Sequence, residues 1–320
     1  MKVAHGLAEY TGTTSTAVTL GVFDGVHRGH QALLRATAEQ ATAHGAEAVA
    51  LLLHPHPELT LRGTAPLLLT TLEERITLIE RLGLLDWLVV LRFDAALAST
   101  TAERFAEEFL QKRLRARAVV LGPHARYGQG ARGDADLLRR LAPPSGWEVR
   151  TLPVQRFGEH EARSDVVRRL IASGDVAAAG LLLGRWHHIS GTVERGRAVG
   201  KRLGFPTANL RPPAEHALPP FGIYAAWATV DGRKVAAAVS YGVRPTYDLT
   251  EPWIEAHLLD AGEVGDLARR VMRVAFVKRL RDEERFDSET ALRAQIAADC
   301  EAARKVLASV SLPVFPEVLQ

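Results

Sequence analysis

The sequence has few of the features that mark secreted, membrane-spanning or nucleic-acid-binding proteins. It contains a single cysteine in 320 residues, so no disulfide can form within the chain. That residue, Cys300, lies in an amphipathic stretch and is predicted to be a buried or half-buried side chain. No apolar run approaches the roughly 20 residues that span a bilayer, and the N-terminus lacks the apolar segment of a signal peptide. We therefore expect a cytoplasmic protein without a membrane partner.

An excess of charge of one sign is also absent. The net charge is only +3, and Lys and Arg are scattered rather than gathered in runs. Nucleic acid is therefore not expected as a partner. The composition, 47% hydrophobic and 24% charged, is that of a globular chain, and 320 residues suffice for two domains of ordinary size. The sequence shows no internal repeat, and it leaves a homo-oligomer open.

The first half of the chain alternates between strand-like apolar runs and helix-like stretches. The predicted strands and helices fall at residues 17–20, 31–44, 48–53, 72–82, 87–91, 101–114, 118–121, 134–141 and 147–152, beginning with a strand and ending with one. Regular alternation at these spacings predicts βαβ units. The expected fold class is therefore α/β, with a parallel sheet covered on both faces.

Beyond Gly184 glycine, proline and β-branched residues dominate. Residues 222–230 alternate with period two and meet Asp231-Gly232, a hairpin signal, before a second run at 234–239. Residues 288–307 have helical spacing. This pattern predicts a small antiparallel β-barrel with a terminal helix. We set the domains at 1–183 and 184–320, and expect the histidines at 187 and 188 to be linker or surface residues.

A glycine- and histidine-rich segment, GVFDGVHRGH at residues 21–30, lies between the first strand and the first helix. An open parallel sheet binds ligands at this edge. Gly21, Gly25 and Gly29 would let the backbone approach a phosphate chain, and the helix start offers free N–H groups. His27 and His30 point the same way. Two imidazoles so placed could hydrogen-bond a triphosphate and stabilise charge on departing pyrophosphate.

Two alternatives remain for this histidine pair. The histidines could bind zinc, although no other Cys/His cluster completes four ligands, or they could be ordinary helix-start residues. The surrounding residues, however, resemble the HxGH signature of the nucleotidyltransferase superfamily. In the longer form GxFDGxHxGH they resemble the FMN adenylyltransferase module of bacterial bifunctional FAD synthetases, and residues 54–57 and 68–94 follow the same family. The resemblance implies a Rossmann-like domain in which Phe23 and Asp24 also contribute to ATP binding.

Further along, this chain departs from the adenylyltransferase pattern. In residues 122–128, His124 stands where the family has a polar acceptor, and Ala125 where it has an aromatic residue. In the family's Ser-Ser-Thr-x-Ile-Arg segment, Ser164 and Arg168 are retained, and the resemblance implies that both bind ATP.

The same segment carries two replacements, Arg163 for serine and Asp165 for threonine. A carboxylate offers a phosphate only acceptors and negative charge, so Asp165 should weaken phosphate binding unless Mg²⁺ or Arg163 compensates. The domain could therefore be a working adenylyltransferase, or a degenerate or re-specialised module that acts as a scaffold or binds flavin.

The second constellation is the string GKRLGFPTANL at residues 200–210. Gly196, Gly200 and Gly204 precede a Pro-Thr turn, which suits a loop that wraps phosphates. Thr207 and Asn209 face the same side of an extended strand. Their hydroxyl and amide oxygens suit one Mg²⁺ that keeps water and substrate phosphates in its other positions. A lone Thr-x-Asn pair is also common in turns.

The whole string resembles the GFPTAN motif of riboflavin kinases, and the resemblance continues through residues 218–224, 242–247, 253–260 and 280–286. It implies that Glu255 is the catalytic carboxylate, which takes the proton from the riboflavin 5′-hydroxyl as it attacks the γ-phosphate of ATP. Ser240 departs from the family, which usually has Asn there.

Together the resemblances predict a bifunctional enzyme. Riboflavin and ATP would give FMN, and FMN and a second ATP would give FAD and pyrophosphate, with Mg²⁺ as the metal. A riboflavin kinase with an inactive first domain is the second hypothesis, and a non-catalytic flavin sensor is the third.

Overall fold

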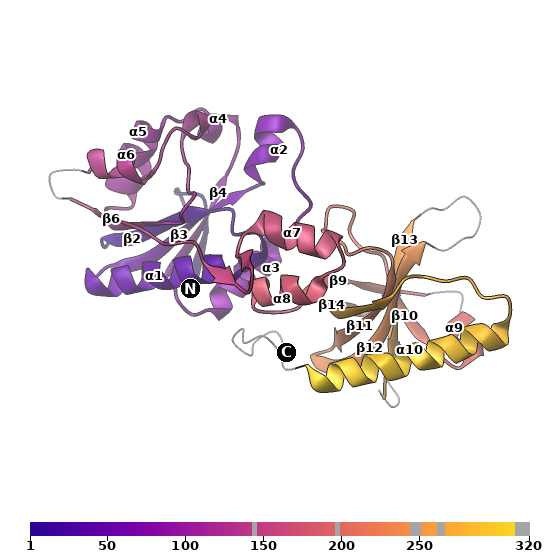
Figure 1. The fold of residues 1–320 in the computed structure, drawn as a ribbon. Helices are drawn as coiled ribbons and strands as arrows, with labels where there is room; N and C mark the ends of the chain where they lie inside the picture. Colours follow the sequence, from indigo (N-terminus) through magenta and orange to yellow (C-terminus); the bar gives the residue numbers. More distant parts are fainter. Residues whose placement is uncertain (143–145, 196–198, 244–250, 261–265, 311–320) are drawn as a thin grey trace. The chain divides into compact units, whose positions relative to one another are not determined.

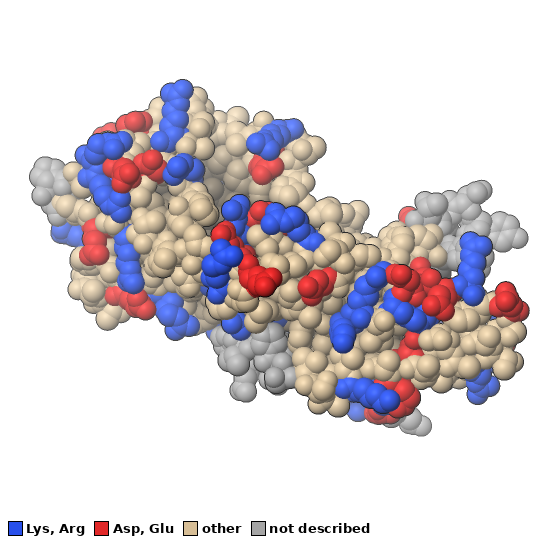
Figure 2. Space-filling view, in the orientation of Figure 1, with Lys and Arg blue, Asp and Glu red and all other residues tan. Residues whose placement is uncertain are grey.

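The structure is a computed structural model that describes residues 1–142, 146–195, 199–243, 251–260 and 266–310. The chain divides into two compact units, Met1–Ser164 and Asp165–Gln320 (Figure 1). This division groups the helices that follow residue 164 with the second unit. The functional boundary that we set at residues 183 and 184 stays a prediction. Basic and acidic side chains are interspersed on the face that Figure 2 shows, in line with the scattered charge of the sequence.

The first unit is built on a six-stranded sheet in the order β1-β4-β3-β2-β5-β6, in which every strand pair is parallel. The strands are β1 (Lys2–His5), β2 (Thr16–Gly21), β3 (Glu47–His54), β4 (Trp87–Arg92), β5 (Ala116–Leu121) and β6 (Glu148–Thr151). The four central strands are nearly continuous runs of buried residues, because helices cover both faces of a parallel sheet. The predicted α/β class is confirmed; the edge strand β1 was not predicted.

Helices connect these strands. They are α1 (Arg28–Ala43), α2 (Pro57–Arg62), α3 (Leu72–Arg81), α4 (Ala95–Ala98), α5 (Ala102–Phe105) and α6 (Ala135–Arg140), with short 3₁₀ turns η1 (Asp24–Val26) and η3 (Gln129–Ala131). The helix expected at residues 101–114 begins as α5 and continues as the π-helical segment η2 (Ala106–Arg113). A two-stranded ribbon, β7 (Arg156–Phe157) with β8 (His160–Glu161), follows the sheet.

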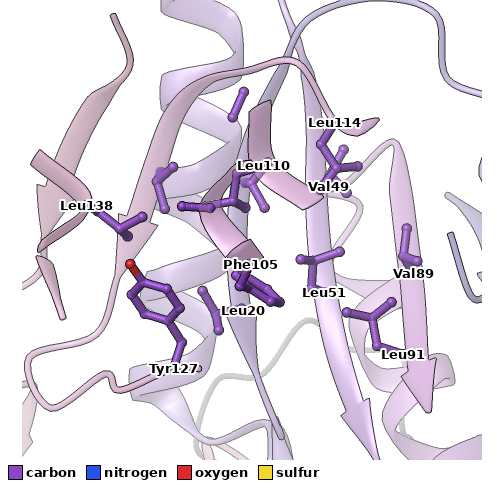
Figure 3. Close-up of a cluster of buried hydrophobic side chains, with 14 of the residues drawn as sticks. Leu20, Val49, Leu51, Val89, Leu91, Phe105, Leu110, Leu114, Tyr127 and Leu138 are labelled. Carbon is purple, nitrogen blue, oxygen red and sulfur yellow. The ribbon is translucent and has the colours of Figure 1, made fainter. Parts of the chain in front are cut away.

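The α5–η2 segment covers one face of the sheet with apolar side chains. Figure 3 shows Phe105, Leu110 and Leu114 against Leu51 and neighbouring strand residues. These side chains are at most 4% exposed. Burial of this kind is worth about 1.5–3 kcal/mol per large apolar side chain, so it stabilises the sheet whose strand β2 leads into the first site.

The second unit is a closed antiparallel barrel of six strands in the order β10-β13-β12-β11-β14-β9. The strands are β9 (His187–Glu194), β10 (Thr207–Leu210), β11 (Gly222–Val230), β12 (Arg233–Val243), β13 (Pro252–Leu258) and β14 (Val271–Arg281). The helices are α7 (Ser164–Ala172), α8 (Val176–Leu183), α9 (Val199–Leu203) and α10 (Glu289–Ser309). The predicted barrel and terminal helix are confirmed.

The barrel has two apolar layers. Inward-facing residues such as Tyr224, Val239 and Ile254 fill its interior. The terminal helix α10 packs across β11, β12 and β14 from outside, with Ala303 and the predicted buried Cys300 against Ala225 and Ala238 of the barrel wall. The hairpin expected at Asp231-Gly232 joins β11 to β12, and both turn residues have positive φ, 49° and 74°.

Our expectation for His187 and His188 was wrong. Both histidines lie in β9 and are only 2% and 5% exposed. His187 Nε2 is 2.8 Å from the carbonyl oxygen of Ala217. They are buried because β9 is a barrel strand that pairs with both β10 and β14, rather than a linker.

Candidate active sites

The first candidate site is the turn between β2 and α1. Phe23, Gly25 and Val26 all have positive φ, at 54°, 80° and 41°. Two of these are not glycine, and such a backbone persists only where the surroundings fix it. Asp24 supplies part of that constraint. Its carboxylate, 1% exposed, accepts hydrogen bonds at 3.1 Å from the backbone N–H groups of Leu69 and Thr70.

The predicted ATP-binding residue Asp24 is therefore turned into the protein. It also accepts from the Thr70 hydroxyl at 3.1 Å and lies 3.9 Å from the guanidinium of Arg75. The Ser164 hydroxyl donates to the backbone oxygen of Asp24 at 2.9 Å, so Ser164 joins this turn. The carboxylate of Asp24 holds the turn in place, and an ATP contact by Asp24 stays a prediction.

The two histidines of the motif lie together at the start of α1. Their rings stack with centroids 3.6 Å apart and an interplanar angle of 19°. His27 is the N-cap of α1, and its Nδ1 accepts the backbone N–H of His30 at 3.3 Å. An imidazole that accepts at Nδ1 carries its proton on Nε2 and is neutral. With Nδ1 accepting the N–H of His30, the ring proton of His27 lies on Nε2.

The second imidazole, that of His30, is kept neutral by its surroundings. Burial holds the pKa of His30 well below its usual value, and the neighbouring His27 and Arg75 lower it further. The Phe23 ring meets His30 edge-on at 5.2 Å between centroids. His54 lies at the end of β3, and burial first, then Arg75, lowers its pKa as well. The pair is therefore suited to donating hydrogen bonds as uncharged imidazoles.

Close backbone approach explains the glycine at position 29. A Cβ there would lie 2.7 Å from the carbonyl oxygen of Ala162 and 3.1 Å from the His27 ring, so no side chain fits without movement. At Gly21 a Cβ would meet the Phe23 ring at 3.3 Å. Phosphate contacts by Gly21, Gly25, Gly29 and Phe23 stay predictions.

The divergent segments are placed as follows. His124 is exposed, and Ala125 packs against the apolar cluster of the sheet. Arg163 lies 3.9 Å from Glu161, and Asp165 lies in the first turn of α7, where it accepts from Arg169 at 3.1 Å. Arg168 also lies in α7. The ATP contact predicted for Arg168 and the compensation predicted for Asp165 stay predictions.

The second candidate site is a row of polar residues across three adjacent strands on the outer face of the barrel. The strand register sets Asn209 of β10 opposite Glu255 of β13, and Glu255 opposite Ser240 of β12. Residues directly opposite in antiparallel strands have side chains on one face. Their neighbours Ile254 and Tyr241 point into the barrel core. The barrel thus brings together three residues that are far apart in the sequence.

The geometry of this row confirms that Thr207 and Asn209 face one side of their strand. The Thr207 hydroxyl donates to Glu255 Oε2 at 3.4 Å, and Asn209, 5% exposed, lies opposite Glu255. A hydroxyl, an amide oxygen and a carboxylate are hard oxygen donors, which fit Mg²⁺. Among the described residues no group of three His, Cys, Asp or Glu side chains could hold a metal.

The segment before Thr207 differs from the expected open loop. Residues 199–203 form the short helix α9, and the Phe205 N–H donates to the carbonyl oxygen of Gly200 at 2.7 Å. A Cβ on Gly200 would lie 2.3 Å from the Phe205 oxygen, so glycine is required there. Gly204 has φ +89° and ends the helix. Gly196, also predicted to bind ATP, lies outside the described residues.

Two functional candidates were missed in the sequence. Arg75 supports the first site, and Glu283 belongs to the second: the Ser240 hydroxyl donates to Glu283 Oε1 at 3.4 Å. Partial loss of solvation raises the pKa of Glu283, the charge of Glu255 raises it further, and the Ser240 bond opposes the shift. A Cβ on Gly242 would lie 2.0 Å from the Glu283 carboxylate, so this glycine makes room for it. The glycine in the strand was the available signal.

Comparison with known proteins assigns both halves of the chain to known families. The family model for FAD synthetase matches residues 10–166, and the model for riboflavin kinase matches residues 183–307. The first range contains the turn between β2 and α1 with His27 and His30, and the second contains Thr207, Asn209 and Glu255; Arg168 lies between the two ranges.

Individual relatives match over nearly the whole chain. A bifunctional riboflavin kinase/FMN adenylyltransferase from Escherichia coli K12 is 36% identical over 290 residues, which cover 90% of this chain and 91% of the relative. Proteins of the same description from Pseudomonas fluorescens and Bacillus subtilis are 34% and 30% identical, covering 91% and 89% of this chain and 92% and 90% of their own.

The fold is shared with a crystal structure described as a macrolide-efflux protein from Streptococcus pneumoniae. The TM-score is 0.84 at 29% identity, and the match covers 95% of this chain and 98% of that chain. Within the described part of this chain, no helix has the length and apolar character needed to cross a membrane.

Proposed function

Because the chain belongs to the family of bifunctional riboflavin kinase/FMN adenylyltransferases, we propose that its barrel site phosphorylates riboflavin and its sheet site transfers AMP from ATP to FMN. The chain is a transferase with both activities. The residue roles given below are our own assignments, and the substrates are riboflavin, FMN and ATP. Because ATP is a substrate of both reactions, we also place the protein in the cytoplasm.

The kinase assignment rests mainly on one observation, that Glu255 faces both Thr207 and Asn209 across a single strand pair. In the proposed reaction the Glu255 carboxylate accepts the proton of the riboflavin 5′-hydroxyl. The freed oxygen bonds to the γ-phosphorus of ATP, the bond to the bridging oxygen breaks, and ADP leaves. A carboxylate suffices as base because phosphoryl transfer depends mostly on positioning and charge stabilisation.

The metal requirement of this site is assigned to the oxygens of Thr207 and Asn209. A bound Mg²⁺ would neutralise phosphate charge as the γ-phosphoryl group moves. Thr207 and Asn209 would hold it in β10, shortly after the helix α9, which contains Gly200 and is followed by Gly204. Both glycines, with Gly196, are proposed to lie against the ATP phosphates.

In the adenylyl transfer, a phosphate oxygen of FMN bonds to the α-phosphorus of ATP, and the bond to the bridging oxygen of pyrophosphate breaks. His27 and His30 donate hydrogen bonds to the phosphate oxygens on which charge grows. The stacked rings at the helix start support this role, since the free N–H groups of α1 favour an anion there. Ser164 and Arg168 are proposed to bind the same ATP.

The test incubates the protein with riboflavin, ATP and Mg²⁺ and separates the flavins by chromatography. We expect FMN first and FAD later. FMN without FAD would refute the adenylyltransferase assignment, and the absence of both products would refute the kinase assignment. An Arg163→Ser, Asp165→Thr double variant tests the divergent segment: a variant that forms FAD faster than the natural sequence shows that these replacements weaken ATP binding.

A further inference from the structure

Arg75 is the largest fully buried side chain of the described residues, although neither motif contains it. It lies in α3, is 1% exposed, and points its guanidinium at the turn between β2 and α1. Nη1 donates to the carbonyl oxygen of Val22 at 3.0 Å, and Nη2 donates to that of Thr70 at 3.2 Å. The third partner, Asp24, is equally buried. A buried charge pair is costly unless hydrogen bonds complete it, and the bonds from Nη1 and Nη2 offset part of that cost here.

These contacts hold a backbone that is unfavourable by itself. Val22 and Asp24 flank Phe23, whose left-handed φ is a strained state for a non-glycine residue. Arg75 donates a hydrogen bond to the carbonyl oxygen of Val22, the residue before Phe23. It also pairs with the carboxylate of Asp24, the residue after Phe23. Arg75 itself is held by α3, because Thr71 and Glu74 form a reciprocal capping box that stabilises the N-terminus of this helix.

The same guanidinium charge acts on the imidazoles. Arg75 lowers the pKa of His30, after burial and His27, and it lowers that of His54, where the nearby Glu73 opposes it. The stacked geometry points the same way: His27 is neutral by its hydrogen bond, and two charged rings 3.6 Å apart would repel. The Nδ1 atom of His30 is buried and has no hydrogen-bond partner in the described part of the chain, which disfavours a proton there.

We propose that Arg75 is a positioning residue for adenylyl transfer: its buried guanidinium holds the Phe23–Asp24 turn in place and sets a positive charge near the histidine pair. This inference rests on the proposed function of the first site. It adds that the position of the histidine pair depends on an arginine outside the motif, through the turn that this arginine holds. In this proposal the carboxylate of Asp24 supplies the negative charge that balances the buried guanidinium of Arg75.

The test compares two substitutions, Arg75→Gln, which removes the charge, and Arg75→Lys, which keeps it. For Arg75→Gln we expect FAD formation from FMN at pH 8 to fall about hundredfold, because the turn is misplaced. We also expect the NMR titration of the His30 ring, assigned with a His30→Asn variant, to begin at higher pH than in the natural protein. The acid limb of FAD formation should move with it. FMN formation by the same chain is the internal control and should be unchanged.

For Arg75→Lys we expect the titration of His30 to match the natural protein, with FAD formation reduced by about tenfold or less. The proposal is overturned if His30 titrates alike in the natural protein and Arg75→Gln, or if Arg75→Lys shifts the titration as far as Arg75→Gln does. The proposal is also overturned if Arg75→Gln loses the same fraction of FAD formation at every pH while the titration of His30 is unchanged. The titration needs no turnover, so failure of the natural protein to make FAD would refute the proposed function without deciding the role of Arg75.

Discussion

Glu255 combines three properties that make it the sharpest single position to test. It lies opposite Asn209, accepts from Thr207, and is far from the first unit in the sequence. Glu255→Gln keeps the shape and removes the base. We expect FMN formation to fall by about 10²–10⁴, the usual contribution of a general base. FAD formation from supplied FMN should be unchanged, as measured by chromatography from each starting flavin.

The matched control for Glu255→Gln is Glu284→Gln, an exposed carboxylate in the segment after β14. It should leave both activities as they are. If Glu255→Gln forms FMN at the natural rate, Glu255 is not the base. If both products fall together, the substitution has damaged the whole chain instead of the reaction.

Thr207 is tested by removing one oxygen. Thr207→Val keeps the β-branched shape in β10 and deletes the hydroxyl that faces Glu255. We expect the Mg²⁺ concentration for half-maximal FMN formation to rise by about tenfold or more, since even outer partners of a metal site cost that much. A Mg²⁺ titration measures it. Thr229→Val, in β11 next to the hairpin, is the control, and an equal requirement in both variants would contradict the assignment.

How far these residues could be predicted depends on whether their partners are near in sequence. His27 with His30, and Thr207 with Asn209, lie within one turn or one strand, so spacing alone placed each pair on one side. Arg75 could not be found this way. Its partner Asp24 belongs to another element, and helical periodicity in residues 72–82 says only which face is buried, not that an arginine on it meets a carboxylate.

Among the elements, α9 and the turn after it lead into β10, to which we assign the metal, and Gly200 of α9 packs closely against the Phe205 backbone. Gly200→Ala forces a Cβ to within 2.3 Å of a backbone oxygen, Phe205 O, so the turn must move. Thr207 Oγ1 lies 3.5 Å from the same Cβ position. A displacement near 1 Å at a reacting group can cost about hundredfold, so we expect FMN formation to fall by tenfold to about hundredfold.

Gly191→Ala is the control for that helix variant. It lies in β9 of the same unit, and its Cβ would make ordinary contacts of 3.4 Å and longer. FMN formation should be nearly natural in Gly191→Ala, and FAD formation natural in both. Equal rates in Gly200→Ala and Gly191→Ala would show that the α9 turn does not position Thr207.

Strong periodicity predicted most elements, and the errors have physical causes. The alternation in residues 222–230 and the Asp231-Gly232 turn predicted the hairpin, since both signals are local. By contrast, α9 contains glycine and is only one turn or so long, and its register depends on the bond from Phe205 back to Gly200. His187 and His188 were predicted to be linker residues because their burial depends on pairing of β9 with β10 and β14. Those pairings close the barrel between segments distant in sequence, and nearby residues do not reveal them.

For the molecule as a whole, the buried histidines of β9 predict acid sensitivity. Burial, together with the neighbouring His188 and Arg185, lowers the pKa of His187 from 6.5 to about 3, although the hydrogen bond to Ala217 opposes the shift. The unfolded chain therefore binds a proton below pH 6.5 that the folded chain excludes. Stability from this group is complete above pH 6.5 and is lost as the pH falls toward 3. The loss is about 1.4 kcal/mol per pH unit, or about 2 kcal/mol between pH 7 and pH 5.

His187→Gln separates this contribution from that of other groups. Its amide nitrogen can still donate to Ala217, but it does not titrate. Urea denaturation at pH 7 and pH 5 should show a smaller loss of unfolding free energy in His187→Gln than in the natural chain, by about 2 kcal/mol. His5→Gln, an exposed histidine in β1, should behave as the natural chain does. A pH dependence unaltered by His187→Gln would contradict the prediction.

The division into two compact units, each with its own site, predicts that the two reactions can be supplied by different chains. Asparagine is a favoured N-cap, so His27→Asn should keep the start of α1 while removing the Nε2–H donor. Alone it should convert riboflavin only to FMN, and Glu255→Gln alone should leave riboflavin unconverted. We expect the kinase site to release FMN, so a mixture of the two proteins should make FAD after a lag, which chromatography at successive times would show. A mixture that accumulates FMN and no FAD would mean that FMN is adenylylated only by the chain that made it.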